Sequence, residues 1–124
     1  MRPPILVVDD NKDAGDMMVL VLNALGYAAD AAVSGADALC LIEKKHYGLA
    51  ILDYKMPHMN GVDLLQRMHA IHPELDAIFL TGHPDINVVY PAMQAGASRV
   101  LAKPVEWADL RPILEHFAPT MQPC

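Results

Sequence analysis

Five short apolar runs alternate with five longer amphipathic stretches, and this alternation limits the possible folds more than any other feature of the sequence. The first run, Ile5–Val8, has the continuous apolar character of a strand that is covered on both faces, whereas the second is weaker and rich in alanine. The runs lie at residues 5–8, 27–31, 49–52, 77–80 and 99–102, and the predicted helices at 12–25, 34–44, 62–71, 85–95 and 106–117. Strands that alternate with helices in this way predict an α/β fold built on a parallel sheet.

The size of the chain predicts one domain. A chain of 124 residues, 53% of them hydrophobic, can bury one core of its own but is too short for two. We therefore expect a single domain over residues 1–124, with its core at about residues 4–118 and a short C-terminal tail.

Charge and hydropathy exclude several partners. The net charge of −6 is of the same sign as a phosphate backbone and would be repelled by it, so we expect no direct binding of nucleic acid. The longest apolar run, Met17–Leu22, is far too short to span a bilayer, so we expect no membrane insertion. Cys40 and Cys124 form neither a disulfide framework nor a metal-binding spacing, which is typical of a reducing cytosol and predicts a cytoplasmic protein.

Three expectations concern the packing of the helices. The first helix is expected to face the sheet with its helically spaced apolar residues, and its methionine-rich side to form core: Met17, Leu20, Val21, Ala24 and Leu25. Cys40 is expected to be a buried apolar thiol. Pro91 and Pro112 lie inside the fourth and fifth helices, and we expect kinks or late helix starts because proline removes an amide donor.

Polar side chains stand at the ends of four predicted strands. Asp9 and Asp10 follow the first strand, Asp53 the third, Thr81 the fourth and Lys103 the fifth. Because ligands of open parallel sheets bind at the carboxyl ends of the strands, we expect these side chains to meet at one edge. Three gathered aspartates favour a hard cation such as Mg²⁺, and a carboxylate beside it is a competent nucleophile toward phosphorus. The ammonium and the hydroxyl would stabilise charge on the phosphoryl group.

These residues and the motifs between them resemble response-regulator receiver domains, in particular the chemotaxis regulators, over essentially the full chain. The matching features are Asp9-Asp10, Asp53 with Met56-Pro57-His58-Met59-Asn60-Gly61 behind it, Thr81-Gly82, Ala92-Met93, Ala95-Gly96-Ala97 and Lys103-Pro104. The resemblance implies a doubly wound, flavodoxin-like fold of five strands in the order 2-1-3-4-5. It also implies a phosphoacceptor of a two-component phosphorelay, supplied by a histidine kinase or a histidine phosphotransfer protein.

The resemblance implies a role for each residue at the strand ends. Asp53 would be the phosphoacceptor, with Thr81 and Lys103 holding the phosphoryl oxygens. The implied Mg²⁺ ligands are Asp10, Asp53 and the backbone carbonyl of Lys55, with Asp9 acting partly through water. The Lys103–Pro104 peptide bond would be cis.

The implied output is a conformational change that signals to a downstream output protein or domain. The protein would then be a signalling switch, a monomer or weak homodimer, and not an enzyme in the ordinary sense. It would either stand alone or form part of a longer chain such as a hybrid kinase.

Three positions depart from the family pattern. Val100 stands where the family carries an aromatic residue that follows the threonine inward on phosphorylation, so we expect that readout to be absent or replaced. Lys55 and His83 place cationic side chains two residues after the acceptor and the threonine, and we expect both to change the lifetime of the aspartyl phosphate.

Other functions are weighed against this one. A pseudo-receiver would use the same fold as a phosphorylation-independent interaction module. A phosphatase with an aspartate nucleophile usually has two aspartates separated by one residue after its first strand, whereas Asp9 and Asp10 are adjacent. Nucleotide binding needs a glycine-rich loop there, and residues 9–12 contain no glycine. His69 and His72 lack an evident third metal ligand, so we interpret them as structural.

Overall fold

The computed structural model describes residues 3–56 and 60–117, in which strands and helices alternate along the chain. The strands are β1 (Ile5–Val8), β2 (Ala29–Ala32), β3 (Leu49–Asp53), β4 (Asp76–Thr81) and β5 (Arg99–Ala102). The helices are α1 (Lys12–Ala24), α2 (Gly35–Lys44), α3 (Gly61–Ile71), α4 (Ile86–Gln94) and α5 (Trp107–Phe117). Each predicted strand and helix is present.

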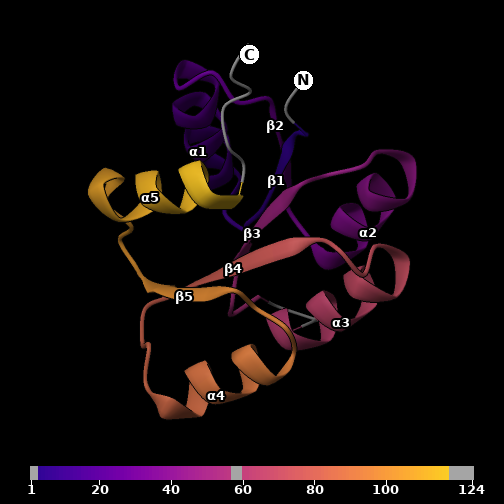
Figure 1. Cartoon of the computed structure of the whole chain (residues 1–124), viewed down its shortest axis with the longest axis vertical. Coiled ribbons are helices and arrows are strands. Elements are labelled where there is room, and N and C mark those ends of the chain that lie inside the picture. The colour runs from indigo at the N-terminus through magenta and orange to yellow at the C-terminus, as the bar shows by residue number, and fades with distance from the viewer. Residues whose placement is uncertain (1–2, 57–59, 118–124) are drawn as a thin grey trace.

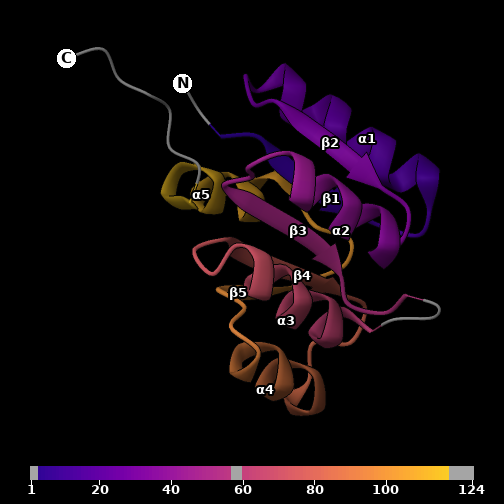
Figure 2. The same cartoon turned by 90° about the vertical axis from the view of Figure 1, so that its right-hand side faces the viewer.

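The five strands form one parallel sheet in the order β2-β1-β3-β4-β5. Helices α1 and α5 cover one face of this sheet, and α2, α3 and α4 cover the other (Figure 1). In Figure 2 the arrowheads of β2 and β3 point the same way, so their carboxyl ends share one edge of the sheet. The predicted doubly wound α/β fold and the strand order 2-1-3-4-5 are therefore confirmed.

The central strands are apolar along their whole length because both of their faces are covered. Ile5 and Val7 of β1 join an apolar cluster with α1 and α5, whereas Leu6 and Val8 join a second cluster with α2, α3 and α4. All four side chains are at most 3% exposed. This burial on two faces explains why the run lacks the alternation of a half-exposed strand.

Strand β2 begins two residues later than predicted, because the chain before it completes the end of α1. Gly26 adopts a φ of 91°, a left-handed conformation that favours glycine. The amide of Tyr27 then donates to the carbonyl of Leu22 at 2.9 Å, so Tyr27 belongs to the helix cap and not to the strand.

Helix α1 buries a different face from the one predicted. Four residues of the expected inner stripe are exposed: Met17 (60%), Leu20 (62%), Val21 (38%) and Ala24. The buried face contains Gly15 and Leu22, with Met18 and Leu25 partly buried beside them. Apolar residues lie on most sides of this helix, so their spacing alone could not choose the face that meets the sheet.

The prediction that Cys40 is buried is wrong, because Cys40 is exposed on α2. The buried side of this helix carries Ala38 and Ile42, which are both fully buried. Cys40 lies two residues from each of them, and two residues of an α-helix turn the side chain about 200° away.

The two internal prolines do not delay their helices. Helix α4 starts at Ile86 and continues through Pro91, and α5 starts at Trp107 and continues through Pro112. Both helices start within one residue of the predicted position and five residues before the proline, so the proline does not set the start, and the alternative of a kink stays a prediction. In both helices the proline is the sixth residue.

A polar cluster joins β2 to the chain before β3 at the amino-terminal half of the sheet. The carboxylate of Asp30 accepts hydrogen bonds from Lys45 Nζ at 2.8 Å and from the hydroxyl of Tyr47 at 2.7 Å. The hydrogen bond from Lys45, followed by that from Tyr47, lowers the pKa of Asp30 below its ordinary value. Burial and the same carboxylate raise the pKa of Tyr47. We call Asp30, Lys45 and Tyr47 the structural cluster.

Both histidines of α3 and its cap bond to main chain, in agreement with a structural role. Nε2 of His69 lies 2.9 Å from the carbonyl of Leu75, and Nε2 of His72 lies 3.0 Å from that of Ile42. Among the described residues, no helix is both long enough and apolar enough to cross a membrane.

Candidate functional site

Strands β1 and β3 bring three aspartates together at the carboxyl edge of the sheet. Val8 is paired with Leu52, so Asp9 and Asp53 follow neighbouring positions of adjacent strands. One carboxylate oxygen from each of Asp9, Asp10 and Asp53 lies within 4.8 Å of the others. The predicted gathering of these side chains is present. Hard oxygen donors at this spacing fit Mg²⁺, which takes one or two carboxylates and keeps several waters.

Asp53 is held in an environment that disfavours its charge. The residue is only 7% exposed, and this burial raises the pKa of its carboxyl above the ordinary value. Lys103 acts in the opposite direction, since its Nζ donates to Asp53 Oδ1 at 2.8 Å, while Asp9 and Asp10 add a further upward shift. A cation bound here would relieve this repulsion.

Strands β4 and β5 position the hydroxyl and the ammonium. Thr81 is the last residue of β4 and is 7% exposed, and its carbonyl accepts from the amide of Lys103 at 2.8 Å. The hydroxyl oxygen of Thr81 accepts from the amide of His83 at 3.2 Å, which leaves its hydrogen available to a ligand. The Lys103–Pro104 bond is cis, as the resemblance implied.

The loop after β1 shows that neither Asp9 nor Asp10 serves as a helix cap. Asn11 is the N-cap of α1, because its side chain accepts from the amide of Ala14 at 3.1 Å. The carboxylate of Asp9 accepts from the amide of Asn11 at 2.9 Å, which fixes its direction. Asp10 is exposed, so both aspartates are available at the edge. The sequence interpretation missed Asn11, although asparagine before a helix is a recognisable cap.

The chain after β3 returns to the sheet at a position that requires glycine. The amide of Gly61 donates to the carbonyl of Tyr54 at 3.0 Å, and a Cβ at Gly61 would lie 2.5 Å from Cε1 of Phe79. Asn60 caps α3 by accepting from the amide of Asp63 at 2.8 Å. Residues 57–59 of the matched motif lie outside the described residues.

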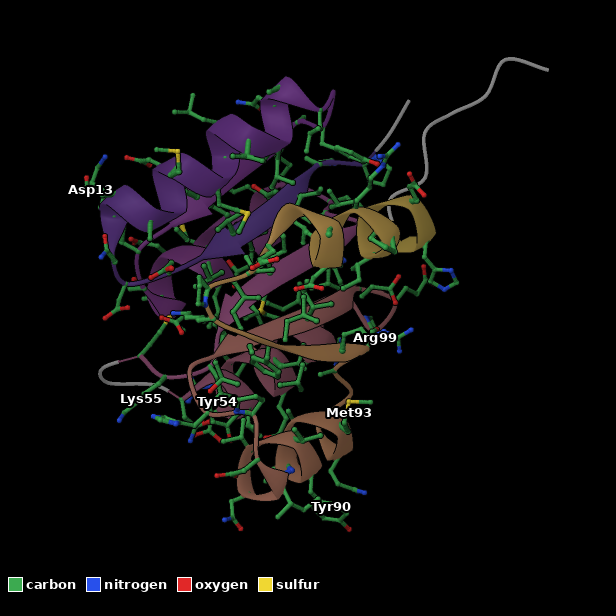
Figure 3. All side chains as sticks on the ribbon, turned by 90° about the vertical axis from the view of Figure 1, so that its left-hand side faces the viewer. Asp13, Tyr54, Lys55, Tyr90, Met93 and Arg99 are labelled. Atoms are coloured by element: carbon green, nitrogen blue, oxygen red, sulfur yellow. The ribbon has the colours of Figure 1, made fainter. Side chains whose placement is uncertain are left out.

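The three departures from the family pattern lie close to this edge or on β5. The side chain of Lys55 is exposed and points away from the molecule on the loop after β3 (Figure 3). Its carbonyl as a metal ligand stays a prediction. His83 is exposed as well. Val100 is half-buried and packs against the cluster that contains Phe79, its partner in the β4–β5 register.

A cavity of about 370 Å³ opens beside the carboxylates and was not foreseen from the sequence. Asp9, Asp53 and Lys103 line its polar end, and apolar residues of the sheet, of α1 and of the chain before α5 line the rest. Its volume is within the range of small-molecule sites.

Comparisons with known proteins agree with this geometry. The family model for the response regulator receiver domain matches residues 5–115. The chain is 29% identical over 119 residues to sporulation initiation phosphotransferase F of Bacillus subtilis (strain 168), covering 96% of each protein. It is 33% identical over 102 residues to the C4-dicarboxylate transport transcriptional regulatory protein DctD of Rhizobium meliloti (strain 1021), of which it spans 22%.

A solved structure supports the same relationship. The crystal structure of a CheY-like response regulator receiver domain protein from Methanospirillum hungatei JF-1 superimposes with a TM-score of 0.87 and 30% sequence identity. The match covers 94% of this chain and 93% of that one. The family model, the shared strand order and the aspartates at the carboxyl edge agree, and the chain belongs to the family of response-regulator receiver domains.

Proposed function

We propose that this receiver domain accepts a phosphoryl group on Asp53 from a phosphohistidine of a histidine kinase or a histidine phosphotransfer protein. One observation carries the proposal: the buried carboxylate of Asp53 lies between the carboxylates of Asp9 and Asp10 and the ammonium of Lys103. A carboxylate in this position has a cation for the incoming charge and acidic neighbours for a metal ion.

The residues present fit Mg²⁺, and Asp9, Asp10, Asp53 and the carbonyl of Lys55 would hold it. When bound, the ion neutralises charge on the transferring phosphoryl group. Asp53 supplies the nucleophile: one carboxylate oxygen forms a bond to phosphorus as the bond from phosphorus to the donor imidazole breaks. The electron pair of that bond returns to the imidazole nitrogen.

Lys103 and Thr81 would stabilise the product. The ammonium of Lys103 bonds to Asp53 Oδ1 at 2.8 Å before the reaction, so a small movement brings it to a phosphoryl oxygen. The hydroxyl of Thr81 can donate to a second oxygen, since its own oxygen already accepts from the His83 amide. Donors aimed at developing charge lower the barrier to group transfer.

The signal would be a shift between two conformations that differ in their affinity for phosphate. The half-buried Val100 has no ring to swing, so the rearrangement would pass through the displacement of Thr81 and the start of the β4–α4 connection. A downstream output protein or domain would recognise the changed surface. We further propose that the domain works in the cytoplasm as a monomer or weak homodimer, and that Lys55 and His83 adjust the lifetime of the phosphate.

Intact-mass spectrometry tests the proposal. Incubation with Mg²⁺ and acetyl phosphate should add one phosphoryl mass, and both EDTA and Asp53→Asn should abolish the gain. Asp30→Asn is a matched control, because it removes an aspartate that also pairs with a lysine at 2.8 Å but does not belong to the three gathered aspartates. No adduct together with no beryllofluoride complex would favour a pseudo-receiver.

A further inference from the structure

Two loops enter neighbouring strands at the amino edge of the sheet, opposite the gathered aspartates. Strand β3 begins at Leu49 and β4 begins at Asp76, and these two residues are paired in the parallel register. His46 lies in the chain just before β3, and His72 lies in the chain just before β4. Parallel neighbours start at the same edge, so the two loops lie beside each other.

The imidazole rings of His46 and His72 meet between these loops. Their centroids are 5.0 Å apart, and their planes are inclined by 83°. Two imidazoles that share one ion, at a nitrogen–metal distance of about 2.0–2.1 Å, have centroids roughly 4.5–5.2 Å apart when the angle at the ion is between a right angle and a tetrahedral one. The observed separation falls within this range, so the backbone already holds the rings at a distance that fits a shared ion.

One ring nitrogen of His72 has a partner, and the other is left for a metal. Nε2 of His72 lies 3.0 Å from the carbonyl oxygen of Ile42, in the last turn of α2. A carbonyl oxygen only accepts, so Nε2 carries the hydrogen, and Nδ1 of the neutral ring keeps its lone pair. A hydrogen bond from the second nitrogen to a carbonyl is the usual arrangement of a metal-binding histidine, because it fixes the tautomer and the direction of the ring.

His46 can supply the second nitrogen. Its side chain is exposed, so its ring can turn toward Nδ1 of His72 with little loss of packing. The neighbouring Lys45 is held elsewhere, since its Nζ donates to the carboxylate of Asp30 at 2.8 Å. Within residues 3–56 and 60–117, the only group of three or more potential metal ligands is that of the three aspartates. The histidine pair therefore leaves the remaining positions around an ion to water.

The histidine of α3 that lies closest to His72 in sequence does not join this pair. Nε2 of His69 lies 2.9 Å from the carbonyl oxygen of Leu75, and its ring packs against Gly96, where a Cβ would lie 3.0 Å from Cε1 of His69. The fold thus gives His72 a neighbour from a different loop, which the spacing of histidines on one helix could not indicate. The same arrangement makes His69 a suitable control.

We propose that His46 and His72 form a second metal site, which binds a divalent transition ion such as Zn²⁺ through two imidazole nitrogens and water. Imidazole suits Zn²⁺, Ni²⁺ and Cu²⁺, whereas Mg²⁺ takes oxygen ligands, so the two edges of the sheet select different ions. The bound ion joins the chain after α2 to the end of α3, and these helices lie side by side on one face of the sheet (Figure 1 and Figure 2). The inference goes beyond the proposed function and does not depend on phosphorylation of Asp53.

Titration with Zn²⁺, followed by NMR of the histidine rings, tests the inference. The full chain contains six histidines, and their ring nitrogens report on each one separately. With Mg²⁺ in excess, Zn²⁺ should shift the ring nitrogens of His46 and His72 together along one binding curve. The same curve should appear in Asp53→Asn, which removes a carboxylate of the other site. A shift of His83, next to Thr81 at the carboxyl edge, without shifts of the pair would place the ion among the aspartates and overturn the inference.

Glutamine substitutions separate metal binding from the structural role of His72. The amide of His72→Gln can still donate to the carbonyl of Ile42, so the variant keeps this hydrogen bond and loses Nδ1. His46→Gln and His72→Gln should each weaken Zn²⁺ binding at the remaining histidine by a factor of about 10 or more, which is the loss typical even for a change beside the ligands. His69→Gln is the matched control, because it removes a histidine of the same helix that also bonds to a carbonyl, and it should keep the wild-type affinity.

The outcomes are distinct from those of the phosphorylation experiment. Zn²⁺ that shifts neither ring of the pair, or that binds both glutamine variants as tightly as the wild type, would show that the rings are only packed against each other. If His72→Gln does not fold, the exposed position of His46→Gln decides alone. Absence of a phosphoryl adduct with intact Zn²⁺ shifts would remove the proposed function and leave the metal site in place.

Discussion

Two aspartate–lysine pairs of equal length differ in the net direction in which the fold shifts the pKa of the aspartate. Asp53 and Lys103 are 2.8 Å apart at the carboxyl edge, and Asp30 and Lys45 are 2.8 Å apart in the structural cluster. Burial raises the pKa of Asp53 despite its lysine, whereas the hydrogen bond from Lys45 lowers the pKa of Asp30. The lysine lowers the pKa of its aspartate in both pairs, so the distance between the charged atoms does not decide the net shift.

The surroundings of each carboxylate explain the difference. The side chain of Asp53 is 8% exposed and lies beside Asp9 and Asp10, so it loses hydration and meets like charge. The side chain of Asp30 is 37% exposed and has a second donor in the Tyr47 hydroxyl. The charge of Asp53 would therefore be stabilised by a bound cation, whereas Asp30 already accepts hydrogen bonds from Lys45 and Tyr47.

The largest expected difference between the two pairs is in reactivity. Lys103→Ala should slow phosphorylation of Asp53 by a factor of about 100 or more, the loss typical when a donor to developing charge is removed. Lys45→Ala should leave the rate within a factor of about two, because surface ion pairs contribute little and this one is remote. Initial rates from intact mass with acetyl phosphate measure both, and equal losses would remove the distinction between the pairs.

The next largest expected difference is in how much Mg²⁺ stabilises the Asp53→Asn and Asp30→Asn variants. Mg²⁺ at about 100 times its dissociation constant should stabilise the wild type and Asp30→Asn by roughly 2.7 kcal/mol, because it binds only the folded state. Asp53→Asn lacks one of the three carboxylates, so it should lose most of this stabilisation. Urea unfolding with Mg²⁺ or EDTA gives the values, and an unchanged Mg²⁺ effect in Asp53→Asn would place the metal elsewhere.

Without metal the two substitutions should change stability in opposite directions. Asp53→Asn should raise the free energy of unfolding by about 1 kcal/mol, since it removes a buried charge that two other carboxylates repel. Asp30→Asn should lower it by about 1 kcal/mol, since it weakens two hydrogen bonds to a charged acceptor. The measurement is urea unfolding in EDTA at neutral pH; the same sign for both variants would contradict the assigned pKa directions.

The smallest expected effect is the pH dependence of the free energy of unfolding of each variant relative to the wild type. The folded-state pKa of Asp30 is depressed, so its stabilisation is present above the unfolded-state pKa and is lost as pH falls through the folded-state value. The gap between wild type and Asp30→Asn should therefore shrink below about pH 4. The folded-state pKa of Asp53 is raised, so its ionised carboxylate destabilises the folded protein at neutral pH. This destabilisation should disappear as the pH falls through the folded-state pKa and the carboxylate takes up a proton. Unfolding of the three proteins between pH 7 and pH 3 would test both.

Much of the fold and most of the site could be read from local sequence. The apolar runs predicted the strands because a strand covered on both faces needs apolar side chains throughout, and β1, with both faces buried, shows this. The polar residues directly after these runs predicted the site, since parallel strands end at one edge. The gathering of Asp9, Asp10 and Asp53 and the contact of Lys103 with Asp53 follow from that rule.

Only the tertiary structure decided which face of each helix is buried and in which direction the pKa of each buried carboxylate is shifted. Met17 and Leu20 fit an inner stripe as well as Leu22 does, but in the folded chain Gly15 and Leu22 are buried while Met17 and Leu20 are exposed. The structural cluster joins residues 30, 45 and 47, and the cavity beside Asp53 combines side chains from separate strands and helices. The sequence by itself determined the order of strands and helices and the residues at the carboxyl edge, because these depend on local pattern. The direction of each pKa shift and the shape of the cavity required the folded chain, because desolvation and free space depend on neighbours far apart in sequence.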